Sequence, residues 1–124
     1  WLDPQLAEPV VGARFSGTNN LGGFEWARVC TVVDAAEPSV FAYVVGDRFD
    51  GAPTGEWRFE LTIDGDGTIL HQRFTHARDG RSGTRLLADQ DPTHAQDIID
   101  VRRDVLGRGM SSTLDAIREA IEKR

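Results

Sequence analysis

Apolar and polar residues alternate along residues 12–76, and near residue 91 this pattern gives way to apolar positions spaced mostly three, four or seven residues apart. Alternation with a period of two is typical of β-strands, whereas the longer spacings place side chains along one side of a helix. The order predicts a curved antiparallel sheet that grips one long C-terminal helix. A sheet closed over the apolar side of a helix usually leaves a cavity, so the order also indicates where a ligand would bind.

Five segments carry the strand pattern. Residues 56–63 alternate most cleanly, with Trp57, Phe59, Leu61 and Ile63 on the inward side. Residues 24–34 are apolar on both sides, which is typical of an interior strand. Turns are predicted at 19–23 and 64–67, because Asn, Asp and Gly tolerate positive φ. The predicted strands are residues 12–18, 24–34, 40–45, 56–63 and 68–76, preceded by a strand end and an extended loop over residues 1–11.

The predicted helix begins at Asp91, with Pro92 in its first position, or at Thr93, with Gln96 closing a capping box. Residues 77–90 are predicted as a connecting loop. The apolar residues of the helix share one stripe, as expected for a helix with one buried side. They are Ile99, Leu106, Met110, Leu114, Ile117 and Ile121.

Two glycines, Gly107 and Gly109, fall within the predicted helix, where each costs about 1 kcal/mol relative to alanine. One interpretation is a break, with Ser112 capping a second helix. The other is a continuous helix whose glycines allow close approach to the sheet or to a ligand. We predict the continuous helix, with both glycines on the sheet side or its flank.

Composition narrows the classes of partner. The 124 residues carry a formal net charge of -6, and Arg and Lys are scattered among acids, so no basic surface for nucleic acid is predicted. No apolar run approaches the roughly 18 residues that span a bilayer, so no membrane partner is predicted. Cys30, the one cysteine, lies in a strand-like segment, which favours a small buried hydrophobe and allows a reducing compartment. We therefore expect a soluble, cytoplasmic protein.

The sequence contains no complete motif for metal binding or catalysis. Residues 64–67 begin like a calcium loop, but the later ligand positions are wrong, so a hairpin turn is predicted. His71 and His76 are an odd number of residues apart on one strand and point to opposite sides, and His94 lies at the helix start. No metal and no cofactor is therefore predicted, and these motifs assign no catalytic residue.

The inward side of the predicted sheet is an aromatic wall with a few polar residues. For each aromatic residue taken singly, plain core packing is the favoured explanation. Gln72 is more informative, because a buried amide needs a partner, and it predicts water or a ligand beside it. Arg28 and His76 lie nearer strand ends, where a rim position is an equal alternative. The predicted ligand-binding residues are Trp26, Arg28, Tyr43, Trp57, Phe59, Gln72, Phe74, His76, Met110 and Leu114.

Several segments occur in an order and spacing that carry a family resemblance. They are residues 11–17, Phe24 and Trp26 followed by Cys30, then residues 41–46, 57–61 and 109–114. Together they resemble actinobacterial proteins of the SRPBCC superfamily, the START-like, polyketide cyclase/dehydrase-like helix-grip group. The resemblance spans nearly the whole chain. It implies an α+β helix-grip fold, a curved antiparallel β-sheet wrapped around a long C-terminal α-helix, with a hydrophobic small molecule bound between them.

The family domain opens with a strand, two short helices and a second strand, of which this chain has at most the tail, at residues 1–3. We interpret residues 1–124 as a single SRPBCC-like domain that is N-terminally incomplete relative to the family. One sheet edge would then be unpaired, and apolar residues around Ile99 and Leu106 would be exposed. This predicts a homodimer that covers the open end or pairs sheet edges.

Three functions stay open at this point. The leading one is binding of a hydrophobic or aromatic small molecule, because the inward side is aromatic and lacks an acid–base pair. The second is a polyketide cyclase/dehydratase-type enzyme, in which His76, Arg28 or Tyr43 polarises a carbonyl or moves a proton. The third is an interaction module whose open sheet edge adds a strand from another chain.

Overall fold

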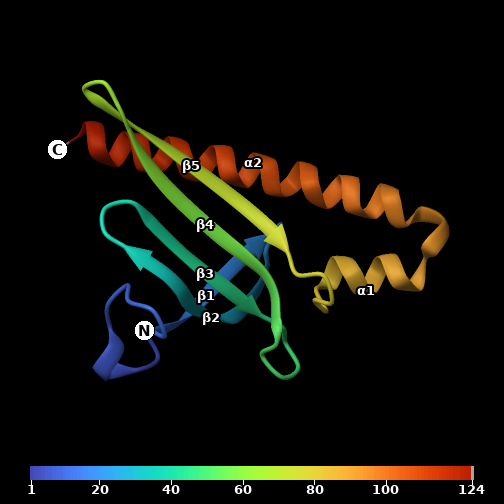
Figure 1. Ribbon diagram of the computed structural model, residues 1–124. Coiled ribbons are helices and arrows are strands. Elements are labelled where there is room, and N and C mark those ends of the chain that lie inside the picture. The colour runs from blue at the N-terminus through green and yellow to red at the C-terminus, as the bar shows by residue number, and fades with distance from the viewer. Residues whose placement is uncertain (124) are drawn as a thin grey trace. The chain divides into compact units, whose positions relative to one another are not determined.

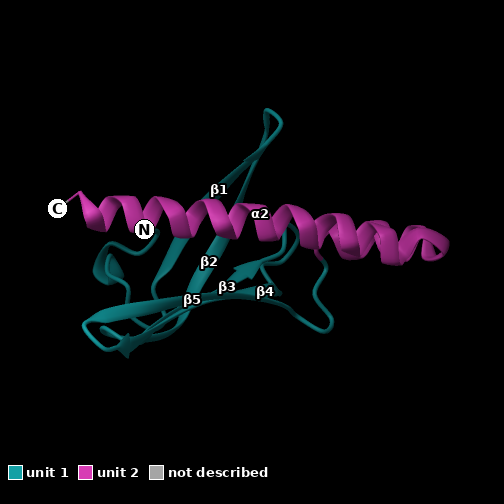
Figure 2. Cartoon of the chain, turned by 90° about the horizontal axis from the view of Figure 1, so that it is seen from above, with its two compact units in different colours: residues 1–81 teal, residues 82–124 magenta. Residues whose placement is uncertain are grey.

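A computed structural model describes residues 1–123 and shows an α+β chain, with strands first and helices last, as the sequence predicts (Figure 1). The chain divides into two compact units (Figure 2). Unit 1, Trp1–Arg81, holds the sheet, and unit 2, from Ser82 onward, holds the α-helices.

The sheet has five antiparallel strands that lie side by side in sequence order, and it is strongly curled (Figure 1). The predicted interior strand, β2, does have a neighbour on each side, and β1 and β5 form the edges. The pairing of β2 with β3 shifts between Val32 and Asp34, which marks a β-bulge at Val33. The strands are β1 (Arg14–Leu21), β2 (Phe24–Ala36), β3 (Val40–Gly46), β4 (Pro53–Asp64) and β5 (Gly67–His76).

The β1–β2 hairpin is longer than predicted. Residues 19–21 belong to β1, and only Gly22 and Gly23 form the turn, both with positive φ of 60° and 87°. The Asn20 side-chain oxygen accepts a hydrogen bond from the backbone N–H of Gly23 at 3.1 Å. Two consecutive residues with positive φ match the right-handed twist of paired strands, which is why the two glycines suffice.

The first residues do not form the predicted strand end. Residues 1–3 have no strand assignment, and a single 3-10 turn, η1 (Pro4–Leu6), follows them. They are held to the start of β1 instead. The Leu2 N–H donates to the Arg14 carbonyl at 2.8 Å, and the Arg14 guanidinium pairs with the Asp3 carboxylate at 3.0 Å.

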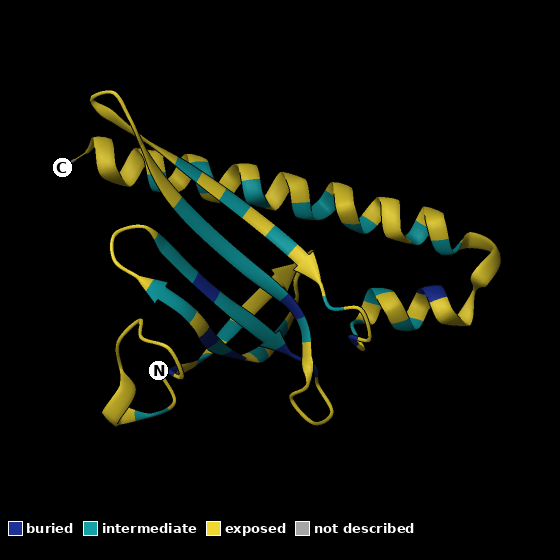
Figure 3. Cartoon of the chain, viewed as in Figure 1, coloured by how far each residue is buried: buried dark blue, intermediate teal, exposed yellow. Residues whose placement is uncertain are grey.

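The buried apolar side chains of the described residues are few and small (Figure 3). Val32 is the largest side chain that is fully buried. The large aromatic residues of β3, β4 and β5 are only half-buried. The sheet therefore keeps most of its aromatic surface partly accessible. The buried apolar residues are Ala13, Cys30, Val32, Ala42 and Ala88.

The β3–β4 loop is organised by one buried carboxylate. One oxygen of Asp47 accepts hydrogen bonds from the backbone N–H groups of Phe49, Asp50 and Gly51, at 2.9–3.0 Å. The other oxygen lies 2.6 Å from the Arg81 guanidinium, which also pairs with Asp50 at 2.7 Å and covers the Phe49 ring at 5.2 Å. We call this set of five residues the loop clamp.

Electrostatics favour the charged form of the clamp carboxylate. Burial alone raises the pKa of Asp47, but the three backbone N–H groups and the Arg81 charge outweigh it and lower the pKa to about 2. The side chain is fully buried, with 0% of its surface exposed. Both oxygens of this buried anion are therefore compensated.

Gly80 precedes Arg81 and lets the chain pass close to the start of β4, next to the loop clamp. A Cβ on Gly80 would lie 2.8 Å from the Thr54 carbonyl oxygen and 2.9 Å from its Cα, both backbone atoms that cannot move aside easily. The same carbonyl accepts a hydrogen bond from the Ala77 N–H at 2.8 Å. The segment after β5 thus packs directly on the start of β4, and only glycine fits at this position.

The connector predicted as a loop over residues 77–90 contains a helix, so that part of the prediction is wrong. Helix α1 (Gly83–Gln90) begins after Ser82, whose hydroxyl oxygen accepts a hydrogen bond from the Arg85 N–H at 3.1 Å. Serine is a favoured residue at this capping position. The eight-residue length and the glycine at its start hid the helix from the sequence pattern.

The long helix α2 (Ala95–Glu122) begins later than either predicted start. Residues 92–94 form a separate 3-10 turn, η2 (Pro92–His94), so the predicted capping box does not form. Gln96, its expected partner, donates instead to Asp100 at 2.9 Å. Proline does begin a helical turn here, as expected, but the turn is 3-10.

Helix α2 runs without a break through both glycines, which confirms the continuous helix. Within its own unit, a Cβ on Gly107 or Gly109 would meet nothing within 4 Å. Within unit 2, therefore, no other segment packs closely against these two glycines. The Thr113 hydroxyl donates to the Gly109 carbonyl at 2.9 Å, a local bond within the helix.

Candidate functional site

One side of the sheet is aromatic across three neighbouring strands. Tyr43 of β3 lies opposite Trp57 of β4, and Trp57 lies opposite Phe74 of β5. Directly paired residues point to the same side of a sheet, so these rings share one side. The same register adds one polar residue, Gln72, opposite Phe59. We call this side the aromatic face, defined by Phe15, Phe41, Tyr43, Trp57, Phe59, Gln72 and Phe74.

Two ring contacts position the β4–β5 part of the aromatic face. The ring centroids of Trp57 and Phe74 lie 4.8 Å apart with planes at 48°. The Phe74 ring also covers Gly55, where a Cβ would lie only 2.6 Å from ring carbons. An aromatic ring commonly fills the space above a glycine in a neighbouring strand. The absence of a side chain at Gly55 therefore leaves the space that the Phe74 ring occupies.

Two residues of the face, Phe15 and Phe41, were missing from the predicted site. The Phe15 ring contacts Tyr43 at a centroid distance of 5.0 Å, and Phe41 contacts Tyr43 at 5.8 Å. Phe41 is paired with Phe59 across β3 and β4. The alternation of residues along β1 and β3 already placed both on the inward side, so the signal was present in the sequence.

Gln72 is the polar residue in the middle of the aromatic face. Phe74 and Leu70, two residues away along β5, point to the same side. The Gln72 side-chain oxygen is buried and has no hydrogen-bond partner among the described residues. A buried acceptor without a donor costs about 1–3 kcal/mol. The side chain thus lies where strand alternation predicts, with one hydrogen bond left unmade.

The register brings Trp26 and Arg28 to the same side, but toward the β1–β2 end of the sheet. They pair with Asn19 and Gly17, and the Trp26 ring lies 5.7 Å from Phe24, which is 70% exposed. The Arg28 guanidinium donates to the carbonyl of its neighbour Ala27 at 2.8 Å. This end of the sheet is therefore more open to solvent than the middle.

His76 also shares the side of the aromatic face and lies at the end of β5, opposite Gly55. Its side chain is exposed, and Nδ1 lies 2.7 Å from the Ala77 carbonyl oxygen, so this nitrogen carries the ring proton as a donor. Strands β2 and β5 are not neighbours in the sheet, so the pairing does not place His76 beside Arg28.

The two helix residues of the predicted site, Met110 and Leu114, lie four positions apart on one side of α2 and are half-buried. Ile121, further along the same stripe, is 63% exposed. Their role in a binding site stays a prediction from the sequence.

The opposite side of the sheet is charged. Arg58 of β4 pairs with Asp34 of β2 at 2.9 Å and with Glu56 at 3.4 Å. Arg73 of β5 pairs with Glu60 of β4. The Arg73–Glu60 pair is exposed and the Arg58 pairs are partly exposed, and ion pairs at exposed sites contribute little to stability but mark a side that meets solvent. The alternation of side chains along the strands thus separates the aromatic face from the charged side of the sheet.

Burial shifts two ionisable groups of the aromatic side toward their neutral forms. Desolvation raises the pKa of Tyr43, and the nearby Cys30 adds to the shift. Burial likewise raises the pKa of the Cys30 thiol. Tyr43 is therefore a neutral hydrogen-bond donor and Cys30 a poor nucleophile. Within residues 1–123, no three His, Cys, Asp or Glu side chains cluster as a metal site.

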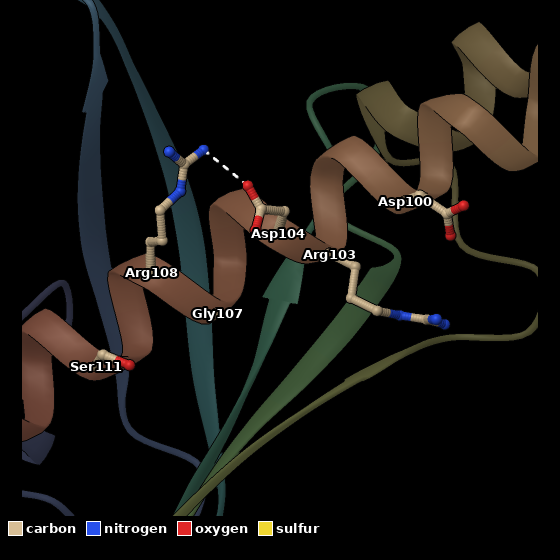
Figure 4. Close-up of a pocket in the computed structure, with 6 residues that line it drawn as sticks. All are labelled: Asp100, Arg103, Asp104, Gly107, Arg108 and Ser111. Carbon is tan, nitrogen blue, oxygen red and sulfur yellow. Dashed lines mark ion pairs between the residues drawn. The ribbon is translucent and has the colours of Figure 1, made fainter.

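A hollow lies along one side of α2 where Gly107 lacks a side chain (Figure 4). Two of the charged residues that line it, Asp104 and Arg108, pair with each other at 3.0 Å. No apolar side chain lines the hollow, so it does not suit a hydrophobic ligand. Its lining residues are Asp100, Arg103, Asp104, Gly107, Arg108 and Ser111.

A solved structure with a similar fold is the solution structure of the Polyketide_cyc-like protein Cgl2372 from Corynebacterium glutamicum. It is 26% identical to this chain, and the match covers 98% of this chain and 69% of that one with a TM-score of 0.69. No protein-family model matches the chain, and no curated protein matches it. The chain has a polyketide cyclase-like SRPBCC fold, consistent with the α+β helix-grip class that the resemblance implied.

No helix within residues 1–123 is long and apolar enough to cross a membrane.

Proposed function

We propose that this protein binds a hydrophobic or aromatic small molecule on the aromatic face of its sheet. The observation that carries the proposal is the half-buried wall formed by Tyr43, Trp57, Phe59 and Phe74, with one buried polar atom, that of Gln72, in its midst. Ligand sites in proteins are typically apolar and aromatic surfaces with a small number of polar groups. Met110 and Leu114 of α2 remain predicted contributors.

The packing of the sheet supports a binding role over a purely structural one. A sheet that used its aromatic side only as a core would bury its largest side chains, yet Val32 is the largest one fully buried. Partly accessible apolar area gains free energy when a ligand covers it, at about 25 cal/mol for each Å² removed from water. The polyketide-cyclase-like name of the structural neighbour is consistent with a small-molecule role.

Binding is tested with 2-methoxynaphthalene, an apolar aromatic probe, by equilibrium dialysis. Saturable one-to-one binding to the wild-type protein is expected. Phe74→Ala should weaken it about tenfold or more, because it removes ring contact and leaves a gap over Gly55. The matched control is Leu87→Ala in α1, a 57% exposed side chain whose loss should leave binding unchanged.

Circular dichroism on each variant separates lost binding from lost folding. No saturable binding by the folded wild-type protein, or equal binding by folded Phe74→Ala, contradicts the proposal.

A second candidate is a cyclase/dehydratase-type enzyme, favoured by one observation. Tyr43 lies on the aromatic face with a raised pKa, so its neutral phenol can donate a hydrogen bond to a carbonyl oxygen. In that case Tyr43→Phe abolishes turnover of a polyketide-type substrate but leaves its binding intact. Equal turnover by the two proteins excludes the enzyme function through Tyr43.

A further inference from the structure

We propose that the ligand of the aromatic face carries a hydroxyl or N–H donor that bonds to the side-chain oxygen of Gln72. This inference rests on the proposed function and adds the chemical class of the ligand. It distinguishes phenols, alcohols and amides from bare hydrocarbons, ethers and esters, which offer only acceptors or nothing.

The starting observation is the unmade hydrogen bond. The Gln72 oxygen is buried and has no donor among residues 1–123. Nearly all buried polar groups in folded proteins have a partner in the protein, in water or in a ligand, and the exceptions call for an explanation. Here the partner has to come from outside the described chain.

The surroundings decide what kind of partner fits. Gln72 lies opposite Phe59 and between Leu70 and Phe74 along its side of β5. Bridging waters need two to four polar partners of their own. The residues beside Gln72 along and across the strands are aromatic or aliphatic, so a donor attached to an apolar body fits better than water alone.

The donors already present on the same side of the sheet are engaged or lie on other strands. The Arg28 guanidinium of β2 donates to its neighbouring carbonyl, and His76 at the end of β5 donates through Nδ1 to Ala77. Tyr43 lies on β3, which is not a neighbour of β5, and the indole N–H of Trp57 on the neighbouring β4 makes no hydrogen bond to the Gln72 oxygen. A donor on a ligand would thus supply the hydrogen bond that the Gln72 oxygen lacks.

Three probes of one shape test the inference: 2-naphthol, 2-methoxynaphthalene and naphthalene. The first carries a hydroxyl donor, the second only an ether oxygen and the third no polar group. Equilibrium dialysis on the wild-type protein should show 2-naphthol binding about five- to tenfold more tightly than 2-methoxynaphthalene, the range of one net hydrogen bond to a buried acceptor.

Gln72→Leu removes the acceptor while keeping an apolar side chain of similar length. It should bring the ratio of the two affinities to about one, mainly by weakening 2-naphthol. The matched control is Gln90→Leu at the exposed end of α1, which makes the same change away from the face and should keep the wild-type ratio.

The outcomes separate the two proposals. Equal affinities of the wild-type protein for all three probes overturn the donor inference and leave the binding function standing. Tighter binding of 2-methoxynaphthalene than of 2-naphthol also overturns the inference, because the site then offers a donor. An unchanged preference in Gln72→Leu overturns it as well. No binding of any probe overturns both proposals.

Discussion

The sheet unit holds buried oxygens on two polar side chains, those of Asp47, which is buried, and of Gln72, which is half-buried, and their surroundings differ. Asp47 sits in the β3–β4 loop with three backbone N–H groups on one oxygen and the Arg81 guanidinium on the other. Gln72 sits on the aromatic face with a buried oxygen that no described group satisfies. The acceptors of Asp47 are satisfied by the protein itself, whereas the oxygen of Gln72 lacks a hydrogen-bond donor among the described residues.

This difference indicates which polar side chain stabilises the fold and which one is available to a ligand. Removing one partner of a satisfied buried group leaves the others without a bond and destabilises the fold. Removing a buried group that has no partner takes away only a cost. Stability measurements on variants of the two residues therefore read out which role each one has, without knowledge of the ligand.

Asp47→Ala should cause the largest loss of stability. It leaves the N–H groups of Phe49, Asp50 and Gly51 without their acceptor and Arg81 without its main buried partner. Thermal unfolding followed by circular dichroism is expected to show the lowest melting temperature among these variants. The control is Asp50→Ala, whose exposed side chain contributes less, and a larger loss there would reverse the assignment within the clamp.

Gly80→Ala should destabilise next most strongly, by about 1–3 kcal/mol, because the new Cβ meets backbone atoms of Thr54 at 2.8–2.9 Å. Gly107→Ala is the matched control. Its Cβ meets nothing within unit 2, and alanine should raise the stability of the helix by up to about 1 kcal/mol. Urea unfolding measures both. Gly80→Ala at wild-type stability would show that the segment after β5 does not pack against the start of β4.

Acid should selectively weaken the loop clamp. The pKa of Asp47 is lowered to about 2 in the folded protein, below its unfolded value of roughly 3.9. Its stabilisation is thus fully present above about pH 4 and is lost as the pH falls toward 2. Urea midpoints between pH 5 and pH 2 should fall less steeply for Asp47→Asn than for the wild-type protein. Parallel profiles would show that this carboxyl group does not set the acid response.

Gln72→Leu should have the smallest effect on stability. The change removes an unpaired buried oxygen, so the melting temperature should stay the same or rise, by no more than the cost of about 1–3 kcal/mol that such an oxygen carries. Differential scanning calorimetry beside Gln90→Leu measures it. A clear fall in the melting temperature of Gln72→Leu alone would show that Gln72, like Asp47, stabilises the fold.

The fold was largely predictable because hydrophobic period and turn residues are local signals. The alternation in β4 placed Trp57 and Phe59 on one side, and the same rule applied to β5 placed Gln72 among apolar neighbours. Phe15 was missed although the same rule applied to it. The position of Gly107 inside a continuous helix was also predicted correctly.

The loop clamp and helix α1 were not predictable in the same way. Asp47 and Arg81 are far apart in sequence, and no local pattern shows that an aspartate in a Gly- and Asp-rich loop is buried. Helix α1 is short, and its signal is the cap at Ser82 within a segment that resembles a turn. Self-association, the extent of the domain and the ligand-binding roles of Met110 and Leu114 stay predictions.

The aromatic face is tested most directly by amide chemical-shift mapping of the protein with 2-naphthol. Shifts are expected at the backbone amides of Trp57, Phe59 and Phe74 and at the side-chain amide of Gln72, while those of Asp47 and Gly51 stay fixed. Shifts that concentrate in the loop clamp or along the hollow of α2, with the aromatic face unchanged at saturation, would contradict the assignment of the binding site.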